Sequence, residues 1–587
     1  MYKQPQFLSI FEETELITIE SKGGECILIK RSQDGQATVE NGEKPSSPVP
    51  TSIIDVHAIF GVFSLHTHVY VGVVTQQRLI GDIKGCCVFN ATQIKLIPVP
   101  NADSPTDSNV SRLDKHYLSL LEAALSSSHL YYSFDYPLTL SSQAQGGKNT
   151  TPNFDFTWNY YALQPLLSLE GWACPFIMGF VAIDSGISIA GKKIDRFALI
   201  SRRSRHRVGT RFNRRGVNEH GYVANFVETE QILYYNDQVR ALVQVRGSAP
   251  FYWTQPVTLA YAPKCSSRSK LPVEQSLLAF QRHFELLKKS YGEPIVVLSL
   301  IDLSGRETPI SSGFTDHVDK SGIDYVHYHP FDFHHECSKM RYHNLDKLLS
   351  QAGDAIEKIK YFGTSQDGSV LHSQNGVVRT NCMDNLDRTN VVKTKVGEAA
   401  LIKQLRELGV LSDQQDLSSD NQFYFRVFKN AWADNGDAIS IQYSGTGALK
   451  NDFTRTGKRD FRGMLNDGRN SVMRYYLNNF HDGKRQDAYD FVQGNYQIDL
   501  EHPNLSLLKD NQTGASSIRS ILIRMVGVFV VLLVLSMFAP IGETTGSRIG
   551  GILLLWLISA LLTMKMVQTN GRKYANLPKL CLGPLLD

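Results

Sequence analysis

The sequence has little that would indicate a metal site, a disulfide framework or a nucleic-acid partner. Its eight cysteines are scattered without Cys-x-x-Cys spacing, which argues against a zinc site and against dense disulfide pairing. It has no HExxH motif and no cluster of aspartates of the two-metal type. The formal net charge of +4 is too small to imply nucleic acid. We therefore expect a reduced, cytosolic protein body with no metal, no cofactor and no nucleic-acid partner.

The first residues lack the pattern of a secretory signal. MYKQPQFLSIFEETE has no basic segment followed by an apolar one, so we expect no cleavable signal peptide. Glycosylation sequons would be modified only if that expectation were wrong. They stand at Asn90, Asn109, Asn149, Asn504 and Asn511.

Long apolar runs occur only near the C-terminus, at 525–541 and 549–564. Each run is apolar all round, which favours a transmembrane hairpin over two buried core helices with one apolar stripe each. Basic residues flank the pair: Arg519 and Arg524 before it, and Lys565, Arg572, Lys573 and Lys579 after it. Both flanks should therefore be cytosolic.

The length of these runs also indicates a location. Both are slightly shorter than the ~20 residues that span an average bilayer, which suits a thin early-secretory membrane. We expect a multi-pass protein of the endoplasmic reticulum membrane, with the Golgi membrane second, and a cytosolic catalytic domain.

At 587 residues the chain exceeds one hydrophobic core of typical size. Before residue 180, short alternating runs such as CILIKR, YVGVVTQ and CCVFNATQIKLIPV predict strands, and NGEKPSSPVPTS, NADSPTDSNVS and SSQAQGGKNTTPN predict surface loops. Beyond it, strand patterns such as IVVLSLIDL alternate with helical ones such as NLDKLLSQAGDAIEKI. The predicted units are a β-rich subdomain (1–180), an α/β catalytic domain (181–500), a linker (501–520), the hairpin (521–566) and a cytosolic tail (567–587).

The segment 375–405 carries the most specific chemical pattern. Its apolar start, 376–378, predicts a strand, and the part after Thr389 predicts a helix. Between them, Cys382 and Arg388 stand in the pattern Cys-x5-Arg. This pattern suits phosphate-ester cleavage, because backbone N–H groups at a helix N-terminus bind phosphoryl oxygens and a guanidinium can grip two of them. The same positive potential favours a Cys382 thiolate nucleophile.

The Cys-x5-Arg spacing alone can arise by chance, so the other residues of the loop determine how strongly it indicates a phosphatase. Thr389 follows the arginine directly, and Asp384 and Asp387 lie inside the loop. An ionised aspartate repels an anion, whereas a protonated one can act as a general acid. We therefore name Cys382, Asp384, Asp387, Arg388 and Thr389 as catalytic candidates. The backbone of Met383, Asn385 and Leu386 would face the substrate phosphate.

The stretch RTNCMDNLDRTN is similar to the signature RxNCxDCLDRTN of Sac-domain phosphoinositide phosphatases. The resemblance extends through 202–231, 246–255, 331–345 and 430–458, and with the hairpin it favours the integral-membrane Sac1-type members. It implies metal-free hydrolysis of an inositol-ring monophosphate, chiefly phosphatidylinositol 4-phosphate and second the 3-phosphate. One departure is Asn385, which replaces the second cysteine of the signature.

The identity of the general acid stays open between two residues. Asp387 stands before the arginine as in the CxDxxDR loop of myotubularin-type lipid phosphatases, a resemblance that favours Asp387 as the acid. Asp384 would then position water or contact ring hydroxyls.

Two basic segments are further candidates for substrate contact. The segment 202–215 holds seven arginines, of which Arg207 is our candidate, although such a run can equally be a solvated face. Lys450 lies in the glycine-containing stretch 445–459, which lacks the context of a nucleotide-binding loop and predicts a basic loop near the membrane or at the rim of the active site. Asn218, Asn225 and Glu228 are better explained as buried structural groups.

The sequence leaves two other functions open. A membrane-anchored phosphoprotein phosphatase would use the same Cys-x5-Arg chemistry. A catalytically inactive phosphoinositide-binding tether would not need the intact nucleophile. The hairpin and the basic segment favour a bilayer substrate, while protein partners are not specified.

Overall fold

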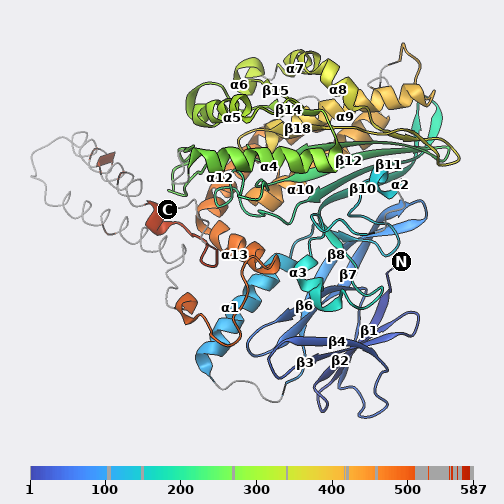
Figure 1. Cartoon of the computed structure of the whole chain (residues 1–587), viewed down its shortest axis with the longest axis vertical. Coiled ribbons are helices and arrows are strands. Elements are labelled where there is room, and N and C mark those ends of the chain that lie inside the picture. Colours follow the sequence, from blue (N-terminus) through green and yellow to red (C-terminus); the bar gives the residue numbers. More distant parts are fainter. Residues whose placement is uncertain are drawn as a thin grey trace, which may run out of the picture.

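The computed structural model of the chain describes residues 2–101, 107–146, 151–267, 272–338, 341–415, 417, 422–456, 461–508, 527, 554, 557, 558, 565 and 571–581. Within them, the chain forms a five-stranded and a thirteen-stranded β-sheet, and most helices gather around the larger sheet (Figure 1). The predicted mixture of α and β structure is confirmed, and most of the strands belong to one large sheet.

The smaller sheet is antiparallel and has the order β4-β3-β2-β1-β5. Its strands are β1 Pro5–Phe11, β2 Leu16–Ser21, β3 Cys26–Arg31, β4 Ala37–Gly42 and β5 Ser52–Asp55. Leu8, Ile17 and Ile29 lie buried with Val71 and Trp172 in one core cluster. The hydrophobic face of this sheet thus packs on the start of the larger sheet.

The larger sheet runs β15-β14-β18-β13-β12-β11-β10-β9-β8-β7-β6, with β16 paired to β13 and β17 to β16. Its strands are β6 Ala58–Ser64, β7 Val69–Ile83, β8 Cys86–Pro98, β9 Leu130–Tyr132, β10 Phe176–Ile189, β11 Lys192–Arg203, β12 Val227–Tyr235, β13 Gln238–Arg246, β14 Ile295–Ser299, β15 Val326–Pro330, β16 Phe362–Thr364, β17 Val370–His372 and β18 Val377–Asn381. The pairs from β6 to β13 are antiparallel, whereas β13, β18, β14 and β15 pair in parallel.

Helices cover the parallel strands on both faces, which explains why β14 and β18 are buried along their whole length. Ile295 and Val297 pack with Phe280 of α4 and Phe314 of α5. Val296, between them, points the other way into a cluster with residues of α7 to α9. The helices are α1 Ser108–Leu125, α2 Ser142–Gly146, α3 Tyr160–Leu163, α4 Val273–Tyr291, α5 Thr308–Ser321, α6 Phe333–Glu336, α7 Leu345–Gln351, α8 Gly353–Ile359, α9 Asp387–Glu407, α10 Asn430–Ser444, α11 Asn451–Thr456, α12 Phe461–Phe480 and α13 Asp482–Val492.

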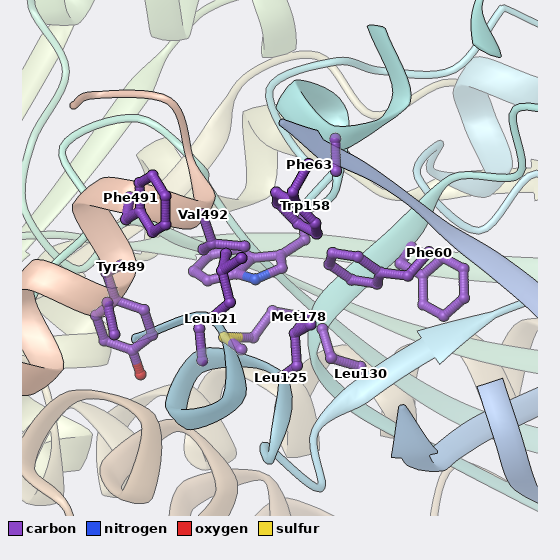
Figure 2. Close-up of a cluster of buried hydrophobic side chains, with 14 of the residues drawn as sticks. Phe60, Phe63, Leu121, Leu125, Leu130, Trp158, Met178, Tyr489, Phe491 and Val492 are labelled. Carbon is purple, nitrogen blue, oxygen red and sulfur yellow. The ribbon is translucent and has the colours of Figure 1, made fainter. Parts of the chain in front are cut away.

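One core cluster joins the N-terminal part of the chain to α13. Figure 2 shows Trp158 between Met178 of β10, Leu121 of α1 and Tyr489 of α13. Val492 belongs to the same cluster and is fully buried. The last helix of the predicted catalytic domain therefore shares its core with the predicted N-terminal subdomain, and β10 spans the predicted boundary at residue 180.

Three local predictions need correction. Residues 108–111, predicted as loop, form the first turn of α1, because the Asp107 side chain accepts a hydrogen bond from Asn109 N at 2.7 Å and caps the helix. The predicted loop 141–153 contains α2. The continuous helix predicted near 344–359 is two helices, α7 and α8, with Ala352 between them.

The predicted hairpin 525–541 and 549–564 lies outside the described residues except for a few isolated positions. Among the helices that are described, we find none with both the length and the apolar character needed to cross a bilayer.

Candidate active site

The Cys-x5-Arg loop lies between a central parallel strand and a long helix, as predicted. β18 ends at Asn381, Cys382 to Leu386 form the loop, and α9 starts at Asp387, slightly before the predicted start. The backbone N–H of Leu300 donates to Asn381 O at 2.7 Å, so the segment after β14 runs beside the loop. Because carboxyl ends of parallel strands meet at one edge, residues after β13 and β14 surround Cys382.

Asn385 fixes the conformation of the loop. Its backbone has a φ of +54°, in the left-handed region that asparagine tolerates better than most residues. Its side-chain Oδ1 accepts a hydrogen bond from the Cys382 backbone N–H at 3.1 Å. Met383 and Leu386 are buried in two different core clusters. The residue that departs from the family signature is thus part of the frame that holds Cys382.

Cys382 is almost fully buried, and so are the cation Arg246 and the hydroxyl residue Thr389 beside the loop. Arg246, at the end of β13, donates to Asn390 Oδ1 at 2.9 Å and to Asn385 O at 3.4 Å. Burial lowers the pKa of Arg246 to about 10, while the nearby Cys382 acts in the opposite direction. Arg246 therefore remains a cation beside the sulfur at neutral pH. Thr389 is buried, and its hydroxyl forms no hydrogen bond within the described part of the chain.

Arg388 is held by two carboxylates that follow β14. Its Nη2 lies 2.6 Å from Glu307 Oε1, and its Nη1 lies 2.9 Å from Glu307 Oε2 and 3.2 Å from Asp302 Oδ1. Nη1 also donates to Leu300 O at 2.9 Å. Burial alone would lower the pKa of Arg388, but Cys382, Glu307 and Asp302 outweigh it and raise that pKa above its ordinary value. A permanently charged guanidinium is thereby fixed next to the loop.

Asp384 is locked between two arginines of the arginine-rich segment. Its carboxylate oxygens each lie 2.6 Å from a guanidinium nitrogen, of Arg211 and Arg215 respectively. Burial alone would raise the pKa of Asp384, but these two cations outweigh it and hold that pKa far below its usual range. Asp384 is therefore ionised and has no proton to give at neutral pH.

Asp387 has a different environment at the first position of α9. Its Oδ1 accepts a hydrogen bond from the Leu449 backbone N–H at 2.6 Å, and its Oδ2 lies 3.4 Å from Arg474 Nη1 of α12. The Asp387 side chain is 27% exposed, so it can meet a substrate. Lys450, next to Leu449, is bound through its backbone N–H to Asp467 Oδ1 at 2.9 Å. The predicted rim segment therefore borders the loop.

Arg207 serves the turn that carries the other arginines. Its Nε donates to the backbone carbonyls of Arg215 and Gly216, both at 3.2 Å. Burial, with a contribution from Arg214, lowers its pKa to about 10. Within the described part of the chain no hydrogen bond joins Arg207 to the loop, whereas Arg211 and Arg215 of the same segment reach Asp384.

The three groups predicted as structural are hydrogen-bonded within the protein. Asn218 Oδ1 accepts from the backbone N–H of Tyr222 at 2.9 Å, and Glu228 pairs with the buried Arg202 at 2.9 Å. Asn225 Nδ2 donates to Asp384 O at 3.3 Å, so it also supports the loop.

Sequence reasoning missed Glu307, Asp302, Arg246 and Arg474. For Asp302 and Glu307 a signal was present, because they follow the buried strand pattern IVVLSLI, where carboxyl ends of parallel strands gather. Arg246 at the end of β13 carries the same signal. Arg474 lies in the middle of a helix, and nothing in its sequence surroundings points to the loop.

A separate cavity of about 440 Å³ does not belong to this site. Its wall includes Gly376, which precedes β18, whereas Cys382 follows β18. The cavity and the loop therefore lie toward opposite ends of that strand. Among the described residues, no three His, Cys, Asp or Glu side chains gather as metal ligands.

A cysteine at the carboxyl end of a parallel strand, an arginine fixed at the start of the following helix and the buried Arg246 beside the loop are the features that a cysteine-dependent phosphatase needs to bind a phosphate group. The family model described as the SacI homology domain matches residues 57–338. The chain is 36% identical over 578 residues to phosphatidylinositol-3-phosphatase SAC1-B of Danio rerio, covering 96% of each chain.

Two further relatives come from distant organisms. Phosphoinositide phosphatase SAC6 of Arabidopsis thaliana is 34% identical, with 98% of both chains covered. Phosphatidylinositol-3-phosphatase SAC1 of Saccharomyces cerevisiae is 32% identical, with 96% of this chain and 91% of the relative covered. The chain belongs to the Sac family of phosphoinositide phosphatases, and the resemblance seen in the sequence is confirmed.

Proposed function

We propose that the chain hydrolyses the ring phosphate of phosphatidylinositol monophosphates, chiefly the 4-phosphate and second the 3-phosphate, through a cysteinyl-phosphate at Cys382. The observation that carries this proposal is the clamp on Arg388. Glu307 and Asp302 aim the guanidinium beside the loop in which Cys382 lies. A preorganised cation of this kind stabilises the charge that builds up on a transferring phosphoryl group.

In the first step the Cys382 thiolate attacks phosphorus, and the bond from phosphorus to the inositol oxygen breaks. Arg388 binds two of the phosphoryl oxygens as a fork. Asp387 gives its proton to the departing oxygen, because an inositol alkoxide is a poor leaving group. The ionised state of Asp384 supports this assignment over the alternative.

In the second step water attacks the cysteinyl-phosphate, and its proton passes to the Asp387 carboxylate. The bond from sulfur to phosphorus breaks, which releases phosphate and restores the thiolate. Asp384, with Arg211 and Arg215, forms a fixed charged frame beside the loop that contacts ring hydroxyls or orders water. Lys450 at the rim contributes positive charge towards the anionic headgroup.

The proposal extends to the membrane. The apolar runs 525–541 and 549–564 would form a hairpin in the endoplasmic reticulum membrane, or second in the Golgi membrane, with the catalytic body cytosolic. Residues 571–581 support this topology, because they return to the catalytic body. The backbone N–H groups of Lys579 and Leu580 donate to Asp487 of α13 at 2.8 and 2.9 Å.

The experiment that tests the proposal compares wild type with Cys382→Ser on a panel of short-chain phosphoinositide monophosphates. We expect Cys382→Ser to reduce phosphate release by several orders of magnitude while lipid binding persists. Cys337→Ser is the matched control, because Cys337 is a buried thiol outside the loop. Substantial residual turnover in Cys382→Ser would overturn the nucleophile. Release from phosphoproteins but not from lipids would favour the protein-phosphatase alternative.

A further inference from the structure

Helix α12 turns an apolar face to the outside. Phe461, Leu465, Val472 and Tyr476 recur at helical spacing, so they lie along one side of the helix. A soluble surface helix would carry polar residues there. The exposed apolar side chains of α12 are Phe461 (69%), Met464 (48%), Leu465 (59%), Val472 (71%), Met473 (44%) and Tyr476 (40%).

The opposite face of α12 packs against the site and is polar. Arg474 is buried, reaches Asp387 at 3.4 Å and donates to Gly447 O at 2.8 Å. Asn478 is also buried and donates to Ser444 O at 2.9 Å. The usual arrangement of a surface helix is thus inverted, with polar groups inside and apolar groups outside. Packing within the described protein does not account for the outward side chains.

The neighbourhood of α12 continues this apolar surface. Tyr261 is 72% exposed and its ring stacks on Tyr475 of α12, with ring centroids 6.3 Å apart. The Tyr475 hydroxyl donates to Leu259 O at 2.8 Å. The described segment 571–581 reaches the same place, because the Asn576 backbone N–H donates to Asn479 O of α12 at 2.8 Å (Figure 1). The segment 571–581, which follows the two apolar runs in the sequence, therefore lies beside α12.

Positive charge borders the apolar face. Arg462 and Arg469 are both exposed on α12. With 3.6 residues per turn, Arg462 and Arg469 both lie along one edge of the face formed by Phe461, Leu465, Val472 and Tyr476. A helix with a continuous apolar side and flanking arginines suits the boundary between headgroups and acyl chains of an anionic bilayer. A folded protein partner would not require cations placed at this margin.

We propose that the outer face of α12 inserts into the headgroup region of the bilayer that holds the substrate. The partner is the lipid surface itself, and the proposal rests on the proposed function, which places the substrate in a bilayer. Since Arg474 of the same helix contacts Asp387, insertion brings the catalytic loop to the depth of the inositol headgroup. α12 thus couples membrane contact to the placement of the general acid.

The test uses the full chain with Cys382→Ser, so that substrate is not consumed, reconstituted into phosphatidylcholine vesicles containing phosphatidylinositol 4-phosphate. Val472→Trp adds a reporter on the proposed face. Val370→Trp is the matched control, because Val370 is 52% exposed on β17, away from α12 in the sequence. Parent fluorescence from the five native tryptophans is subtracted. Lipids with brominated acyl chains quench only fluorophores that enter the acyl boundary.

We expect the added fluorescence to be quenched in the Val472→Trp variant and to be unquenched in the Val370→Trp variant. Equal quenching in the two variants, or none in either, would overturn the proposal. A blue shift without quenching would also overturn it, because it would mean that protein, such as the runs 525–541 and 549–564, covers the face.

A second experiment tests the insertion through phosphatase activity. In the active chain, Leu465→Glu with Val472→Glu should lower the ratio of activity on vesicles to activity on monomeric short-chain lipid about tenfold. An unchanged ratio would overturn the insertion. Activity of the wild-type chain on the monomeric lipid tests the proposed function separately, since no bilayer is present in that assay.

Discussion

Glu307 and Arg388 form a two-pronged ion pair, in which Glu307 Oε1 and Oε2 lie 2.6 and 2.9 Å from the guanidinium nitrogens. Glu307 belongs to the turn before α5 and Arg388 to the first turn of α9. The pair therefore ties the segment after β14 to the helix that follows the loop. It fixes the arginine before any phosphate arrives, which removes an entropic cost from binding.

Glu307→Gln should lower kcat/KM about 10- to 100-fold, because a charge-assisted fork becomes a weaker neutral contact and Arg388 loses its orientation. Glu357→Gln is the matched control, since Glu357 forms an exposed ion pair with Lys403 at 2.9 Å. Steady-state kinetics on short-chain phosphatidylinositol 4-phosphate measures the effect. A fall in thermal stability with unchanged kcat/KM would show that the ion pair is only structural.

Asp387→Asn should slow hydrolysis of phosphatidylinositol 4-phosphate by about 10²–10⁴, because the leaving oxygen loses its proton donor. It should slow a soluble aryl phosphate much less, since an aryl oxide leaves without a proton. Asp384→Asn should slow both substrates alike, because Asp384 is ionised in the wild type. If Asp387→Asn also affects the two substrates equally, or neither, the general acid is another group.

Asp384→Asn should destabilise the protein at pH 7 by about 3 kcal/mol, because Arg211 and Arg215 lose their common carboxylate. The pKa of Asp384 is lower in the folded than in the unfolded chain, so its stabilisation exists above about pH 4 and declines as pH falls below it. The gap in thermal midpoint between wild type and variant should therefore narrow at acid pH. A gap that stays constant with pH would contradict the ionised assignment.

The contribution of Asp487 to stability should change with pH in the opposite direction. Burial raises the pKa of Asp487 to about 6, although the backbone N–H groups of Leu580 and Lys579 act against this rise. A folded pKa above the unfolded one contributes stability that is present below about pH 4 and lost as pH rises through 6. Wild type should thus lose about 3 kcal/mol relative to Asp487→Asn between pH 4 and pH 7. Parallel thermal midpoints across that range would refute the raised pKa.

The proposed cytosolic position of the catalytic body can be tested at two exposed sequons, Asn109 and Asn504. Asn90 is not informative, because it is buried and its Nδ2 donates to Ser128 O and Leu130 O at 2.9 Å. We expect endoglycosidase to leave the electrophoretic mobility of the chain from eukaryotic cells unchanged. The control is the same chain behind a cleavable signal peptide, in which Asn109 should be modified. A shift that Asn109→Gln removes from the native chain would reverse the topology.

The catalytic loop was predictable because its chemistry is local. A strand pattern, Cys382 and Arg388 at a fixed spacing, and a helix pattern lie within one continuous segment, so short-range periodicity suffices. The partners of the loop were not predictable in the same way. Arg211 and Asp384 meet across 173 positions of sequence, so no local pattern could pair them.

The choice between the two aspartates shows the same limit. Asp384 and Asp387 are three positions apart and look equivalent in the sequence. Their difference comes from Arg211 and Arg215 on one side and Leu449 on the other, all distant in the chain. Arg207 had the same sequence signal as Arg211, but the turn directs its side chain to backbone carbonyls.

The continuity of the large sheet limits how the enzyme can be divided. A fragment starting at residue 181 would remove the Phe176–Met178 part of β10, which pairs with β9, and would leave unpaired backbone groups along a new sheet edge. It would also strip α13 of α1 and Trp158, uncovering Tyr489, Phe491 and Val492. Such a fragment would aggregate through both surfaces. The N-terminal sheet must stay as well, because it covers Val71 and its neighbours at the start of the large sheet. A soluble fragment suitable for crystallisation or screening must therefore keep everything from β1 through α13.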